Sequence, residues 1–145
     1  MGECADEIQK ASISLRKKVS DCPLFQVESL RQQVWTTFAS RPPSNVEPLW
    51  NCLRGGEAIH DEEAWMLLGD LLGGQEVIVF FDTSRDSAGV LIPDGYTLET
   101  IIGECSGFVF YVTNRCTEFL LAFDDHDVLT ACGTLASRLK AIRQS

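Results

Sequence analysis

The densest group of side chains that could do chemistry is the run Asp124-Asp125-His126-Asp127. Carboxylate oxygens and imidazole nitrogens bind divalent cations, and the same groups act as general acids and bases. The run therefore suggests a metal site with Asp125, His126 and Asp127 as ligands, or a metal-dependent hydrolase that uses all four residues. Two interpretations compete with these, a helix N-cap and an interaction surface. Because four adjacent side chains rarely point one way, we favour the cap and assign no catalytic residue and no cofactor.

Two further aspartates follow the apolar run 77–81 in the sequence. Asp82 ends that run, and Asp86 comes four residues later. The segment Phe81-Asp82-Thr83-Ser84 lacks the second aspartate of the Asp-x-Asp phosphatase pattern. We therefore interpret this segment as a loop.

The six cysteines do not form a recognisable metal or redox motif. None of them is spaced as Cys-x-x-Cys, and no histidine pattern typical of zinc accompanies them. A nucleophilic Cys–His pair would need His60 or His126 beside one cysteine, and the spacing selects none. We expect free cysteines that act as small apolar residues.

Charge is distributed unevenly along the chain. The 145 residues carry a net charge of −9, and residues 55–127 contain fifteen Asp/Glu against two Lys/Arg. The flanking segments are close to neutral or basic, so the excess acid lies in the middle of the chain. This distribution argues against nucleic-acid binding, which requires a basic surface. It is compatible with a strongly basic protein partner, and equally with acidity that only keeps the protein soluble.

The length and the local patterns predict one α+β domain over residues 1–145. Segments 3–20 and 24–39 have apolar residues at helical spacing, which predicts an N-terminal helical hairpin. Residues 128–143 are predicted to form a C-terminal helix. Further short helices are expected after Asp61 and over 96–103. No apolar run approaches the roughly 20 residues that span a bilayer, and no signal peptide is evident, so we expect a cytoplasmic protein without a membrane partner.

The sheet is predicted from aromatic and β-branched runs. Residues 108–113 and 117–123 are separated by a short turn and should form a hairpin. Both runs are apolar almost throughout, as is 77–81, so we expect these strands to be covered on both faces. The prediction is a small mixed or antiparallel sheet, with Val90–Ile92 as a short edge strand, covered by helices.

Part of the chain resembles a known group of proteins. The resemblance rests on Leu49-Trp50, Trp65, Val77-Ile78-Val79, Phe110-Tyr111-Val112, Asp125-His126-Asp127-Val128-Leu129 and Gly133. Over residues 49–133 the chain resembles small, uncharacterised bacterial α+β proteins. These are similar in size and acidity to the immunity proteins that accompany bacterial toxins. The resemblance implies a binding role, and it carries no catalytic residues over to this chain.

The favoured hypothesis is a cytoplasmic, non-catalytic protein that binds a basic partner, such as a cognate toxin or nuclease, through an acidic surface. The candidate contact residues are the acids of the middle segment, namely Asp61, Glu62, Glu63, Asp82, Asp86, Asp124 and Asp125. The alternatives are the metal-dependent hydrolase of the 124–127 run and a module that dimerises through an exposed apolar face. The sequence does not establish the oligomeric state, nor whether these acids lie together in space.

Overall fold

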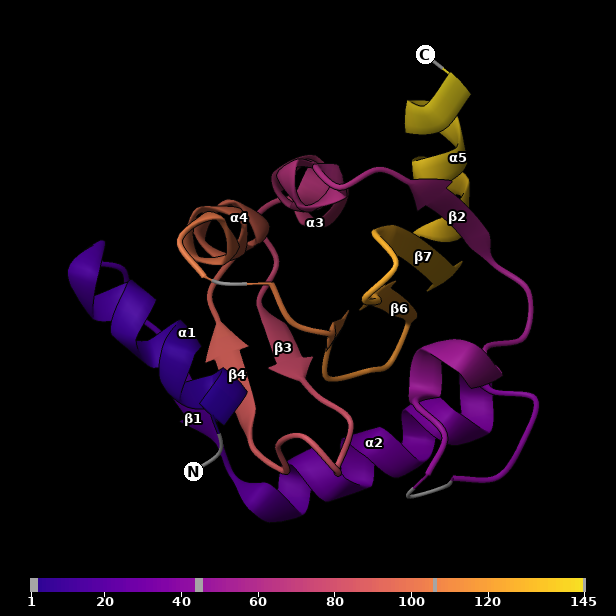
Figure 1. Ribbon diagram of the computed structural model, residues 1–145, viewed down its shortest axis with the longest axis horizontal. Coiled ribbons are helices and arrows are strands. Elements are labelled where there is room, and N and C mark those ends of the chain that lie inside the picture. The colour runs from indigo at the N-terminus through magenta and orange to yellow at the C-terminus, as the bar shows by residue number, and fades with distance from the viewer. Residues whose placement is uncertain (1–2, 44–45, 106, 145) are drawn as a thin grey trace.

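The computed structural model describes residues 3–43, 46–105 and 107–144. Its strands form one antiparallel sheet in the order β1-β4-β3-β5-β6-β7-β2 (Figure 1). The strands are β1 (Ser20–Cys22), β2 (Glu57–His60), β3 (Val77–Phe80), β4 (Gly89–Ile92), β5 (Phe110–Thr113), β6 (Phe119–Phe123) and β7 (Val128–Gly133). The predicted α+β class is therefore confirmed, and the sheet is antiparallel rather than mixed.

The central strands are buried on both faces, as their composition predicted. Every residue of β3, β5 and β6 is buried. Side chains alternate between two apolar clusters along each strand: Phe110 faces one cluster and Tyr111 the other. The predicted hairpin is present, because Phe110 pairs with Phe123 across β5 and β6.

Helices cover the two faces unequally (Figure 1). One face is covered by α2 (Leu24–Phe38) and the short 3-10 helix η1 (Leu49–Cys52). The elements that cover the opposite face are α1 (Glu3–Ser14), the 3-10 helix η2 (Ala64–Leu67), α3 (Leu68–Leu72), α4 (Gly95–Gly103) and α5 (Ala136–Gln144). In the part of the chain that is described, no helix is long and apolar enough to cross a membrane.

The predicted N-terminal helical hairpin is wrong. Between α1 and α2 the chain passes through β1, which pairs with β4. The two helices therefore pack on opposite faces of the sheet and do not form a hairpin. For the same reason β4 is an inner strand, whereas the sequence predicted an edge strand.

The predicted helix over 128–143 is also wrong in its first half. Residues 128–133 form β7, and only α5 is helical. Gly133 ends β7 with φ 77°, where a Cβ would lie 2.4 Å from the Glu118 carbonyl oxygen. The glycine therefore allows the close approach of two strands. As a strand, β7 can pair with β2, and this pairing positions the candidate site.

Candidate binding pocket

The acidic run 124–127 forms the turn between β6 and β7, so the predicted helix cap is wrong. The Asp124 amide donates to the Val128 carbonyl at 3.1 Å and closes the hairpin. Its Oδ1 accepts the amides of His126 and Val128 at 2.8 and 3.2 Å. Asp127 has φ 61°, a left-handed conformation that aspartate tolerates better than most residues. Asp124 and Asp127 therefore help to form this turn.

A second acidic turn lies against the first. His60, the last residue of β2, pairs with Val128, the first residue of β7. The next amide, that of Asp61, donates to the Asp127 carbonyl at 2.9 Å. The Asp61 Oδ1 in turn accepts the amide of Glu63 at 2.9 Å. Two acidic segments that are more than sixty residues apart in sequence are thus joined by one backbone hydrogen bond.

These two turns border a hollow of about 410 Å³ on the face that α3 and α4 cover. Aromatic side chains form part of its lining, and the Phe110 and Phe123 rings stack at 4.5 Å. Phe108 contacts Phe110 edge to face at 5.9 Å. The remaining apolar lining is contributed by Ala64, Trp65, Ile102, Cys105, Val128 and Leu129. A volume of this size lies within the range of small-ligand and side-chain pockets, roughly 300–1,000 Å³.

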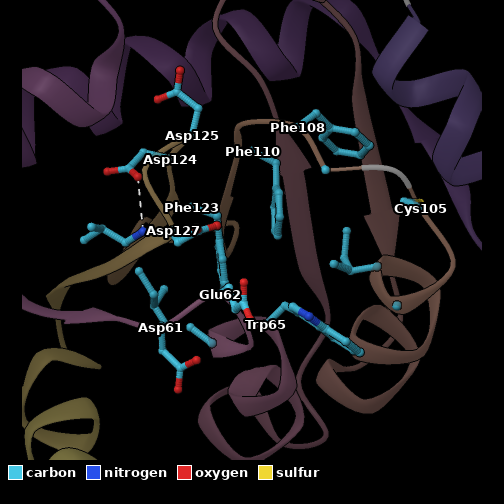
Figure 2. A pocket seen from close by; sticks show the side chains of 16 residues that line it. Asp61, Glu62, Trp65, Cys105, Phe108, Phe110, Phe123, Asp124, Asp125 and Asp127 are labelled. Carbon is cyan, nitrogen blue, oxygen red and sulfur yellow. Dashed lines mark hydrogen bonds between the residues drawn. The ribbon is translucent and has the colours of Figure 1, made fainter.

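The rim of the hollow is acidic on one side (Figure 2). Five carboxylates line it: Asp61, Glu62, Asp124, Asp125 and Asp127. Figure 2 shows Asp61, Asp124 and Asp125 on one side of the hollow and Cys105 and Phe108 on the other. Among the described residues, no lysine or arginine lines the pocket. The hollow therefore combines an aromatic floor with a concentration of negative charge.

Cys105 lies on the apolar side of the hollow, and its thiol is not activated as a nucleophile. Burial raises the pKa of Cys105 to about 12, and the nearby Glu7 carboxylate adds to the increase. Near neutral pH the side chain is therefore a thiol, whereas the thiolate is the nucleophilic form. Burial also raises the pKa of Cys132. Neither cysteine has the lowered pKa that a nucleophilic cysteine requires.

The side chains of the 124–127 turn diverge and do not form one centre. The His126 ring contacts Trp50 edge to face at 5.5 Å, and Trp50 packs against the cluster on the other side of the sheet. Its Nε2 lies 3.5 Å from the Asp125 Oδ1, with both side chains exposed. No group of three His, Cys, Asp or Glu residues within the described ranges is arranged to hold a metal ion.

Two of the predicted contact residues have structural roles elsewhere. Asp82 Oδ2 accepts the Tyr111 hydroxyl at 2.8 Å, and its Oδ1 accepts the amide of Leu49 at 2.9 Å. Asp86 is 4% exposed, and its two oxygens accept the amides of Ala5 and Ala88. Asp86 therefore cannot be part of an exposed contact surface, because its carboxylate is enclosed and fully bonded.

The remaining predicted contact residues fall into two groups. Asp61, Glu62, Asp124 and Asp125 meet at the pocket, whereas the exposed Glu63 lies beside it without lining it. Asp127 was considered within the 124–127 run but was absent from the predicted contact residues, and the sequence did not predict the aromatic floor. The signal for the floor was the predicted hairpin itself, since antiparallel pairing of 108–113 with 117–123 places aromatic residues from both strands together.

Comparison with protein-family models, with curated proteins and with solved structures found no match for this chain.

Proposed function

We propose that this chain is a non-catalytic binding protein that holds a basic partner protein at the acidic side of the pocket. One observation supports this proposal above all. The fold gathers five carboxylates from two distant segments around one hollow that is also lined by aromatic residues, with no lysine or arginine in the lining that the structure describes.

The physical basis is the negative field that these carboxylates produce together at the hollow, which attracts a bound cationic group. A negative field at a concave surface also accelerates the encounter with a basic partner and disfavours acidic ones. The gain depends on salt, because exposed charges are screened over about 8 Å at physiological ionic strength.

The class of partner follows from the resemblance of residues 49–133 to small bacterial proteins that are similar to immunity proteins. An immunity protein blocks its toxin by occupying a functional surface, and a basic nuclease would supply the complementary charge. In this proposal the chain acts in the cytoplasm by binding, without turnover and without a cofactor.

The test compares two variants that lose the same charge from different places. A pocket-neutral variant carries Asp61→Asn, Glu62→Gln, Asp125→Asn and Asp127→Asn. These changes keep the side-chain shapes, and the Asp61→Asn change retains an oxygen that can accept the Glu63 amide. A remote-neutral variant carries Glu3→Gln, Asp70→Asn, Glu76→Gln and Glu118→Gln, none of which lines the pocket.

Proteins captured from a lysate of the source organism would be identified, purified and titrated against wild type and both variants. We expect a basic partner whose affinity falls at least about tenfold in the pocket-neutral variant but little in the remote-neutral one. We also expect weaker binding as salt rises from about 0.01 to 0.15 M, where the screening length falls from about 30 to 8 Å. Equal affinity for wild type and the pocket-neutral variant would refute the proposal.

A further inference from the structure

The hollow is asymmetric, which restricts how a bound group can be oriented. The carboxylates come from the β6–β7 turn and from the segment after β2, on one side. The opposite wall is built by the end of α4 and the residues before β5, including Ile102, Cys105 and Phe108. Figure 2 shows Asp61, Asp124 and Asp125 on one side and Cys105 and Phe108 on the other, with Glu62 beside Trp65 between them. A ligand that satisfies both sides must itself be charged at one end and apolar at the other.

The floor is suited to an apolar group rather than to a charge. Phe110 and Leu129 line it, are almost completely buried, and have side chains without polar atoms. A cation placed there would lose its hydration without gaining a hydrogen-bonding partner. The exposed acids of the rim instead meet a cation that keeps part of its water. The apolar end should therefore enter the hollow while the cationic end remains at the rim.

Trp65 is a partly exposed aromatic residue of the floor. Its ring is half-buried and lies against Gly103 of α4, where a Cβ would approach the ring carbons to 3.0 Å. The absence of a side chain at Gly103 thus lets the indole pack closely against the end of α4. One face of a half-buried tryptophan is a favourable contact for an aromatic or long aliphatic side chain.

We propose that the pocket binds a segment of the partner protein in which an aromatic or long aliphatic residue is adjacent to an arginine or lysine. The apolar side chain occupies the hollow over Trp65 and Phe110, and the basic side chain lies against the acids of the two turns. This inference rests on the proposed function, and it adds an apolar anchor that the electrostatic proposal does not require.

The first test uses three acetylated tetrapeptide amides: Gly-Phe-Arg-Gly, Gly-Phe-Gln-Gly and Gly-Ala-Arg-Gly. Binding is followed by the NMR shift of the Trp65 indole N–H, assigned through a Trp65→Phe variant. We expect Gly-Phe-Arg-Gly to bind about tenfold more tightly than either of the others, since each lacks one half of the match. Equal binding of the Phe-Arg and Ala-Arg peptides, or no binding of any peptide at millimolar concentration, would overturn the proposal.

The second test fills the hollow without changing charge. Gly107 lines the pocket, and a Cβ there would meet no atom within 4 Å, so the backbone position has room for the side chain that Gly107→Trp adds. Gly74 is equally unobstructed and lies outside the pocket, so Gly74→Trp is the matched control. Thermal unfolding of each variant establishes that it remains folded.

The two tests separate this inference from the proposed function. We expect Gly107→Trp to weaken both the Phe-Arg peptide and the full partner by about tenfold or more, with Gly74→Trp close to wild type. If Gly107→Trp binds the partner normally while the pocket-neutral variant does not, the apolar anchor is wrong and the electrostatic function stands. If the pocket-neutral variant also binds normally, the proposed function itself fails.

Discussion

Two sets of carboxylates in this molecule have opposite relations to the protein around them. Asp82 and Asp86 follow β3, and all four of their side-chain oxygens accept hydrogen bonds from this chain. Glu62 and Asp127 lie at the pocket rim, are exposed, and make no side-chain hydrogen bond or ion pair within the described structure. The carboxylates of the first set are fully hydrogen-bonded within the fold, whereas those of the second set could still accept hydrogen bonds from another molecule.

The comparison shows why the position of an acid in the sequence is a poor guide to its role. Asp86 and Asp127 both lie in short polar segments between apolar runs, and both follow a strand. Asp86 is enclosed because α1 packs over it and presents the amide of Ala5. Asp127 stays open because its side chain lies at the rim of the hollow. Contacts from distant segments decide whether a carboxylate is enclosed and hydrogen-bonded or stays exposed.

The largest expected loss of stability is at Asp86, and it tests whether this acid is structural. Replacing it in Asp86→Ala leaves the buried amides of Ala5 and Ala88 without an acceptor, and we expect the free energy of unfolding to fall by about 3 kcal/mol. Urea denaturation monitored by circular dichroism measures the loss. Asp86→Asn keeps one acceptor oxygen and should cost about half as much. A loss below about 0.5 kcal/mol for Asp86→Ala would place it with the exposed acids.

A smaller loss of stability is expected at Tyr111, the hydrogen-bond partner of Asp82. The Tyr111 hydroxyl donates to Asp82 and accepts the Trp50 amide at 3.1 Å, which ties η1 to the sheet. Burial raises the pKa of Tyr111, and the Asp82 carboxylate adds to the increase, so the phenol stays protonated and able to donate. Tyr111→Phe removes both bonds and should lower the free energy of unfolding by about 2 kcal/mol in the same urea assay.

The chain contains a matched control for this substitution. Its other tyrosine, Tyr96, is 58% exposed, so Tyr96→Phe should change stability by less than about 0.5 kcal/mol. Similar losses for the two variants would contradict the role assigned to the Tyr111–Asp82 pair.

The parts of the fold that the sequence predicted are those in which local pattern and final environment agree. Strand β3 and the hairpin of β5 and β6 consist of aromatic and aliphatic residues that are buried on both faces. Strand β1 could not be found this way, because Ser20-Asp21-Cys22 has no apolar pattern. Its extended conformation is fixed by pairing with β4, which is a tertiary interaction.

Strand β7 was missed for a different reason. Leu129, Leu135 and Leu139 are compatible with one long helix, but Leu129 and Ala131 are also two residues apart and are the completely buried positions of a strand. The helical interpretation of 128–133 made the acidic run look like a helix cap. It also hid the pairing of β7 with β2, without which Asp61 and Asp127 could not be placed side by side.

The smallest expected effect on stability is also the most informative about the pocket. The pocket-neutral variant removes four exposed negative charges, and the turn contact of Asp61 with the Glu63 amide is preserved by asparagine. We expect the free energy of unfolding to change by no more than about 0.5 kcal/mol, with a small gain from reduced repulsion. Urea denaturation beside the remote-neutral variant measures this. A loss above about 2 kcal/mol would show that these acids stabilise the fold as Asp82 and Asp86 do. An unchanged or improved stability, together with lost partner binding, would mean that the negative charges at the hollow serve recognition, since they contribute nothing to folding.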